Sequence, residues 1–169
     1  MAAPRKTTYI AVDPAGVTHK RTTKDRTYTN TVVRKGGYQT AIRMAYEAST
    51  PKILQSDFRY YSAIVAGNNP YPARNWAGTP EGAAQAAQED AKRLEEAKKA
   101  LMGATTLDAY CALCCNRRLA QVEEARVAGE YDRWDNLGWQ GRPDLAQGIA
   151  SKFQGNPDYE VRILEAKAI

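Results

Sequence analysis

The N-terminal part of the chain consists of short β-prone runs separated by reversals, and this pattern constrains the fold more than any other feature of the sequence. The runs "TTYIAV" (7–12), "VTHKRTT" (17–23) and "RTYTNTVV" (26–33) are rich in Thr, Tyr and Val, which favour strands. The stretch "DPAG" (13–16) is typical of a tight turn. These features predict a three-stranded antiparallel meander.

The next segments predict a helix and a further strand. Apolar residues recur at helical spacing in "GGYQTAIRMAYEAST" (36–50), and Pro51 is expected to end that helix. The run "FRYYSAIVAG" (58–67) alternates well enough to be predicted as a fourth strand. Residues 67–80 are rich in Pro, Gly and Asn, which indicates a connecting loop.

The second half of the chain is predicted to be mainly helical. Thr79 is a suitable N-cap for a helix that has Pro80 in its first turn and runs to about Met102. A second long helix is expected from near Thr106 towards Tyr131 or Trp134. The short connection between the two predicts an antiparallel helical hairpin.

The end of the chain is predicted to return to the sheet. Gly138 and Gly141 indicate a turn, and Pro143 opens a short helix through Phe153. The run "YEVRILEA" (159–166) alternates as a final strand.

Together these elements predict an α+β fold. It would have one antiparallel sheet of four to five strands with one short helix, plus an appended antiparallel helical hairpin. We expect a basic module at 1–66, a connecting loop at 67–80, and a segment at 81–169 that shares the core of the first.

Positive charge is concentrated at the front of the chain. Residues 1–38 hold eight Lys and Arg against two Asp, whereas residues 80–169 hold twelve Lys and Arg against fifteen Asp and Glu. Such asymmetry favours a polyanionic partner for the basic end. The first candidate site is therefore a nucleic-acid-binding ribbon made of His19, Lys20, Arg21, Lys24, Arg26, Arg34 and Lys35. Two alternatives stay open: an acidic protein surface as the partner, or charged strand edges that are simply solvated.

A second candidate site lies in the aromatic-rich stretch "YDRWDNLGWQGRPD" (131–144). Trp, Tyr and Arg are favoured at binding hot spots, although packing of a helix end would explain them equally well. The residues that we assign to this protein-interaction site are Tyr131, Arg133, Trp134, Trp139 and Arg142.

The three cysteines suggest core packing rather than chemistry. Cys111, Cys114 and Cys115 share one face of the predicted helix, where small apolar side chains usually pack. A metal site or a redox role is the alternative, but no second cysteine pair is available to complete a zinc site. His19, the single histidine, has no nucleophile beside it in sequence. We therefore predict no catalytic residue, no metal and no cofactor.

Residues 13–29, "DPAGVTHKRTTKDRTYT", resemble the opening of small accessory proteins encoded by phages of actinobacteria. In those proteins an Asp-Pro-x-Gly turn precedes a Thr/His/Lys/Arg strand, an Arg-Thr-Tyr-Thr sequence and a Val-rich strand. The resemblance covers residues 1–35 and implies a viral protein that acts inside a bacterium. It implies no role for any residue.

These observations predict a binding protein rather than an enzyme. We expect it to bind nucleic acid through the basic ribbon, with the helical hairpin available for self-association into a homo-oligomer. The alternatives are a host-directed inhibitor or adaptor that contacts an acidic host protein, and an enzyme that acts on nucleotides. The chain has no apolar run long enough to span a membrane and no secretory signal, so we expect no membrane partner and a location in the cytoplasm of the host bacterium.

Overall fold

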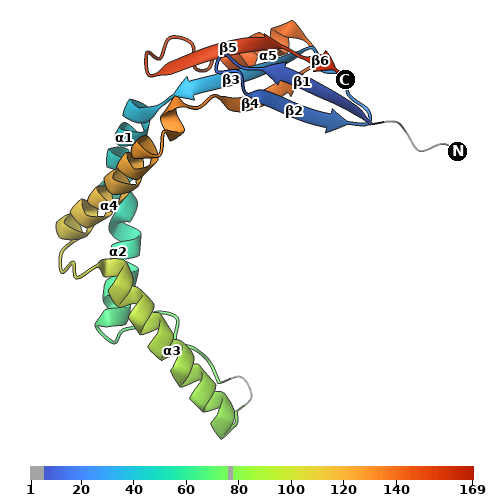
Figure 1. Cartoon of the computed structure of the whole chain (residues 1–169). Helices are drawn as coiled ribbons and strands as arrows, with labels where there is room; N and C mark the ends of the chain where they lie inside the picture. The colour runs from blue at the N-terminus through green and yellow to red at the C-terminus, as the bar shows by residue number, and fades with distance from the viewer. Residues whose placement is uncertain (1–5, 76–77) are drawn as a thin grey trace, which may run out of the picture. The chain divides into compact units, whose positions relative to one another are not determined.

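The computed structural model describes residues 6–75 and 78–169, which contain five α-helices and six β-strands (Figure 1). In chain order these are β1 Thr7–Val12, β2 Thr18–Thr23, β3 Asn30–Gly36, α1 Tyr38–Glu47, α2 Pro51–Val65, α3 Pro80–Leu101, α4 Leu107–Val127, β4 Asp135–Gln140, α5 Pro143–Ala150, β5 Tyr159–Glu165 and β6 Lys167–Ala168. A single 3₁₀ turn at Glu130–Asp132 precedes β4.

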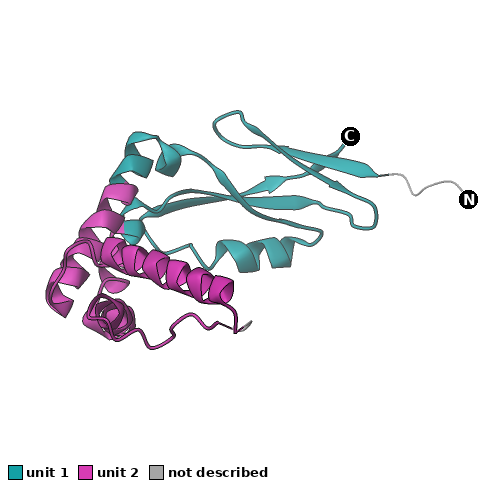
Figure 2. Ribbon diagram, turned by 90° about the horizontal axis from the view of Figure 1, so that it is seen from below, with its two compact units in different colours: residues 1–41, 123–169 teal, residues 42–122 magenta. Residues whose placement is uncertain are grey.

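The chain forms two compact units (Figure 2). Unit 1 comprises residues 1–41 and 123–169, and unit 2 comprises residues 42–122. All six strands lie in unit 1, whereas unit 2 is helical in the residues that the structure describes. The ends of the predicted front module and of the connecting loop, residues 66 and 80, both fall inside unit 2.

The predicted single sheet of four to five strands is wrong, because the strands form two separate three-stranded antiparallel sheets. The first has the order β2-β1-β6 and the second the order β4-β3-β5. The first two predicted strands do pair, but β3 begins only at Asn30 and joins the other sheet. The stretch 24–29 therefore connects two sheets and does not form part of a meander. The predicted C-terminal strand does pair with β3, as β5.

The predicted strand at 58–67 is also wrong, because most of this run lies in the helix α2. Pro51 was expected only to end the preceding helix. That helix, α1, ends at Glu47, and Pro51 is the first residue of α2. Leu54, Phe58 and Tyr61 recur at helical spacing and belong to the core of unit 2. Aromatic β-propensity in this run is overridden by that packing.

The helical hairpin of the prediction does not form. The start of α3 is as expected, since the Thr79 side chain accepts a hydrogen bond from the Gly82 N–H with Pro80 in the first turn. However, α3 packs along α2 and does not form an antiparallel pair with α4. The predicted homo-oligomer was expected to assemble through this hairpin, and that basis for the prediction is therefore lost.

The sheet β4-β3-β5 is covered on one face by α5 (Figure 1). Val32, Ala146 and Ala150 are buried at this contact, and Leu137 and Val161 pack around them. Burial of such side chains is worth roughly 25 cal/mol for each Å² of apolar surface removed from water. This contact therefore stabilises β3 and β4, whose opposite face carries the side chains described below.

The junction between β3 and α1 is held by Asp158. Its carboxylate accepts hydrogen bonds from the Gln39 N–H at 3.1 Å and the Thr40 N–H at 2.6 Å, at the N-terminus of α1. Gly36 and Gly37 have positive φ, and a Cβ at Gly37 would lie 2.6 Å from the Tyr159 ring. Only glycine fits this close approach without strain.

Of the helices in the described part of the chain, none combines the length and the apolar character that crossing a bilayer requires.

Candidate functional site

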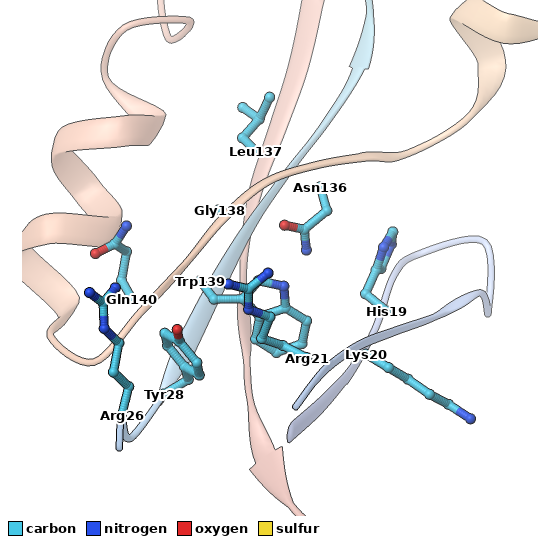
Figure 3. Close-up of a pocket in the computed structure, with 10 residues that line it drawn as sticks. All are labelled: His19, Lys20, Arg21, Arg26, Tyr28, Asn136, Leu137, Gly138, Trp139 and Gln140. Atoms are coloured by element: carbon cyan, nitrogen blue, oxygen red, sulfur yellow. The ribbon is translucent and has the colours of Figure 1, made fainter. Parts of the chain in front are cut away.

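An open pocket of about 410 Å³ lies in unit 1, between strand β2 of one sheet and strand β4 of the other (Figure 3). Both strands are edges of their sheets. The described residues that line the pocket are His19, Lys20, Arg21, Arg26, Tyr28, Asn136, Leu137, Gly138, Trp139 and Gln140. The pocket thus brings four residues of the predicted basic ribbon together with Trp139 of the predicted protein-interaction site.

The register of β1 and β2 decides which basic side chains face the pocket. Tyr9 and Ala11 are buried, and they pair with Arg21 and His19. Because side chains alternate along a strand, Arg21 and His19 lie on the same face as these buried residues, and Lys20 lies on the other. Figure 3 shows the Lys20 side chain extending away from Arg21.

A β-bulge in β4 brings two further side chains to the pocket. The pairing with β3 shifts at Val32/Val33, so that Trp139 lies opposite Thr31 while Asn136 lies opposite Val33. Residues three apart on a regular strand would point to opposite faces, but the extra residue places both on the same face. Asn136 Nδ2 donates a hydrogen bond to Thr31 Oγ1 at 2.6 Å, which fixes its amide.

The floor of the pocket is aromatic. The Tyr9 and Tyr28 rings meet edge to face with centroids 5.4 Å apart, and the Tyr28 and Trp139 centroids are 6.1 Å apart. Tyr28 is only 7% exposed, whereas Trp139 is half-buried and lines the pocket. The two tyrosines therefore support an indole that a ligand can still reach.

The turn that joins β1 to β2 is organised by Asp13. Its Oδ1 accepts hydrogen bonds from the Ala15 and Val17 N–H groups, both at 2.9 Å, and its Oδ2 lies 3.0 Å from His19 Nε2. The side chains of Asp13 and His19 are only 2% and 14% exposed. Burial raises the pKa of Asp13, but the hydrogen bonds from Val17, His19 and Ala15 outweigh it and hold the pKa below its ordinary value.

The pocket is positively charged. Its described lining includes Arg21 and Arg26 but no Asp or Glu, and the Lys20 side chain extends away from the other lining cations. Within residues 6–75 and 78–169, neither Arg21 nor Arg26 forms an ion pair, and both are exposed. Their guanidinium groups are therefore available to an anion, and the described lining offers no thiol or aliphatic hydroxyl as a nucleophile.

The structure separates the other predicted basic residues from this pocket. Lys24 is exposed in the connection between β2 and β3 and does not line it. Arg34 lies near the far end of β3, where its guanidinium stacks over the Phe153 and Tyr159 rings at 4.8 and 4.7 Å. Lys35 follows it and is half-buried. The predicted ribbon is thus divided, because Arg34 and Lys35 lie roughly 14–17 Å along β3 from Asn30, the first residue of this strand.

The predicted protein-interaction residues are also dispersed. The Tyr131 ring contacts the Tyr38 ring, with centroids 5.6 Å apart, and Trp134 is half-buried nearby in sequence. Arg133 donates a hydrogen bond to the Ala128 carbonyl, and Arg142 pairs with Asp144. Of the five, only Trp139 lines the pocket.

The cysteines lie on α4 and are unpaired. Cys111 is buried in the core of unit 2 with Leu54, Leu101 and Tyr110, and Cys114 packs against that core, while Cys115 is half-buried. Among the described residues, no group of three His, Cys, Asp or Glu side chains is placed to hold a metal ion.

Sequence reasoning missed Tyr28, Asn136 and Gln140. The β-prone run 26–33 places Tyr28 in a predicted strand, and Gly138 and Gly141 predict a turn. One signal was available in the alternation of β1, because a buried Tyr9 in a hairpin implies that Arg21 faces the same side. The bulge that turns Asn136 lies beside Gly138, and a glycine inside a strand often marks such a bulge.

Comparison of the chain with models of protein families, with curated proteins and with solved structures found no match. The resemblance of residues 13–29 to phage proteins therefore stays a prediction, and the function must be argued from the pocket itself.

Proposed function

We propose that unit 1 binds nucleic acid at the pocket between β2 and β4. The observation that carries the proposal is the convergence of Arg21 and Arg26 with the Trp139 indole on one open surface whose described lining has no carboxylate. Arg presents a planar fork of donors that matches phosphate oxygens, and aromatic rings stack on bases. A pocket of this size is within the range of small-molecule sites and so admits one nucleotide unit.

The charge distribution supports a polyanion over a neutral ligand. Phosphate contacts by Lys and Arg supply most of the sequence-independent affinity for nucleic acid. The excess of positive charge in residues 1–38 extends this field beyond the pocket lining. A phage accessory role inside a bacterium is part of the proposal and rests only on the resemblance of residues 13–29.

The test is a salt titration of binding. A fluorescently labelled single strand of about 12 nucleotides, and its duplex, are titrated with the protein between about 50 and 200 mM salt. We expect the logarithm of affinity to fall linearly with the logarithm of salt concentration. Replacing Arg21 and Arg26 together by Ala should lower that slope by about 1 for each lost phosphate contact.

A matched control separates a local effect from a change in total charge. Lys52 and Arg59 are exposed on α2 in unit 2, and the double change Lys52→Ala with Arg59→Ala removes the same charge. It should leave the slope nearly unchanged. Binding that is absent, or insensitive to salt, would refute the proposal and favour an acidic protein as the partner, which a pull-down after nuclease treatment would retain.

A further inference from the structure

The pocket offers more than positive charge, since it combines an aromatic surface with a side-chain amide whose oxygen lacks a partner. Within the described residues, Asn136 uses its Nδ2 on Thr31, but its Oδ1 has no hydrogen-bond partner. Amides of this kind pair with the edges of bases.

The Asn136 amide and the Trp139 indole come from one short strand. Both residues belong to β4, and both lie on the face away from α5. Asn136 is fixed by its bond to Thr31, whose hydroxyl in turn donates to the Gly138 carbonyl at 3.0 Å. The Asn136 amide that would contact a nucleotide base is therefore preorganised, while Arg21 comes from β2 and Arg26 from the connection that follows it.

We propose that this pocket takes an unpaired base of a single-stranded nucleic acid, stacked on Trp139, with the adjoining phosphates held by Arg21 and Arg26. This inference rests on the proposed function and makes it specific. A base in a duplex is paired and stacked between its neighbours, so it reaches a pocket only after being flipped out at an energetic cost. A single strand presents its bases freely.

The placement of the remaining cations agrees with a single strand. A duplex contacted by the whole ribbon would require a continuous row of cations along it. Instead Lys20 lies on the opposite face of β2 from Arg21, and Arg34 is engaged by two aromatic rings near the far end of β3. The cations that remain at the pocket are Arg21 and Arg26, beside its aromatic floor.

The decisive experiment compares strands that differ only in their bases. Wild-type protein is titrated with a single strand of about 12 nucleotides, with an abasic strand that keeps all the phosphates, and with the duplex. Loss of one stacked base should weaken binding of the abasic strand by roughly 5- to 150-fold. The duplex should also bind more weakly than the single strand, and a mononucleotide should compete only at far higher concentration.

Variants assign the effect to the pocket. Trp139→Leu should reduce the affinity for the base-bearing strand to that for the abasic strand, and it should leave abasic binding unchanged. Trp139→Phe, which keeps a ring, should retain most of the discrimination, and Trp134→Phe outside the pocket should retain all of it. Because the abasic comparison needs only the wild-type protein, the test stands even if Trp139→Leu does not fold.

The outcomes distinguish this inference from the function on which it rests. Equal binding of the base-bearing and abasic strands, tighter binding of the duplex, or a mononucleotide as tight as the strand would overturn the single-strand assignment while salt-dependent nucleic-acid binding persists. Absence of binding to every probe would overturn the proposed function as well.

Discussion

Arg21 lies directly opposite Tyr9 in the antiparallel pairing of β1 and β2. Since Tyr9 is buried against the Tyr28 ring, this pairing directs Arg21 to the side of the hairpin that carries the pocket. Its neighbour Lys20 pairs with Ile10 and lies on the other face. Lys20 and Arg21, which are adjacent in the sequence, therefore lie on different faces of the hairpin.

This separation predicts unequal effects of two substitutions that remove the same charge. Arg21→Ala should weaken binding of a single strand by roughly tenfold or more, since a charge-assisted hydrogen bond is worth about 1.5–3 kcal/mol. Lys20→Ala should weaken it by less than about threefold, as a solvated charge contributes little. Fluorescence anisotropy at one fixed salt concentration measures both. Equal losses would mean that the ribbon acts through its total charge and not through the pocket.

The buried Asp13 carboxylate should make the hairpin turn sensitive to acid. Its pKa is below the ordinary value, so ionised Asp13 stabilises the fold above about pH 4, and that contribution is lost as the pH falls through the lowered pKa. Asp13→Ala removes its hydrogen bonds to Ala15, Val17 and His19 and should cost about 1–3 kcal/mol at pH 7.

Urea unfolding of the wild type and Asp13→Ala at pH 7 and pH 3 measures this difference. The gap between the two proteins should shrink at pH 3, where the wild type has lost part of the same contribution. Asp25→Ala, at an exposed aspartate in the next connection, serves as the control and should show no gap at either pH. A gap for Asp13→Ala that stays constant with pH would contradict the assigned role.

Two glycines on either side of the α5 N-terminus should respond in opposite ways to alanine. A Cβ at Gly141 would lie 2.6 Å from the Thr27 carbonyl oxygen, so Gly141→Ala should push the 24–29 connection away from the end of β4 and destabilise unit 1 by about 1–3 kcal/mol. Gly148 lies within α5 with open space around it, so Gly148→Ala should stabilise by about 0.5–1 kcal/mol. Thermal unfolding of both variants tests the close approach, and a neutral Gly141→Ala would argue against it.

Local signals in the sequence identified several elements correctly. The Thr79-Pro80 pair marked the start of α3, and the β-prone runs before and after the "DPAG" turn were the paired strands β1 and β2. These features depend on residues close together in the chain, for which capping and turn chemistry give a direct physical reason.

Features that depend on distant packing were not predictable in the same way. The run at 58–67 has strand-like composition. Leu54, Phe58 and Tyr61 nevertheless form a helical stripe, which stabilises α2 only when the α3–α4 connection packs against it. The strand β4 contains a glycine that suggests a turn, and its bulge is imposed by pairing with β3. The pocket needed both β2 and β4, so a single contiguous motif could not reveal it.

The most direct test of the account is a nuclear magnetic resonance titration of the indole N–H signals. Trp139→Phe assigns the Trp139 signal, and a single strand of about 12 nucleotides is then added to the wild-type protein. We predict that the Trp139 indole and the backbone amides of Arg21 and Arg26 shift together, while the Trp134 indole stays in place. A strand that binds without moving the Trp139 signal would contradict the claim that the pocket between β2 and β4 holds the base.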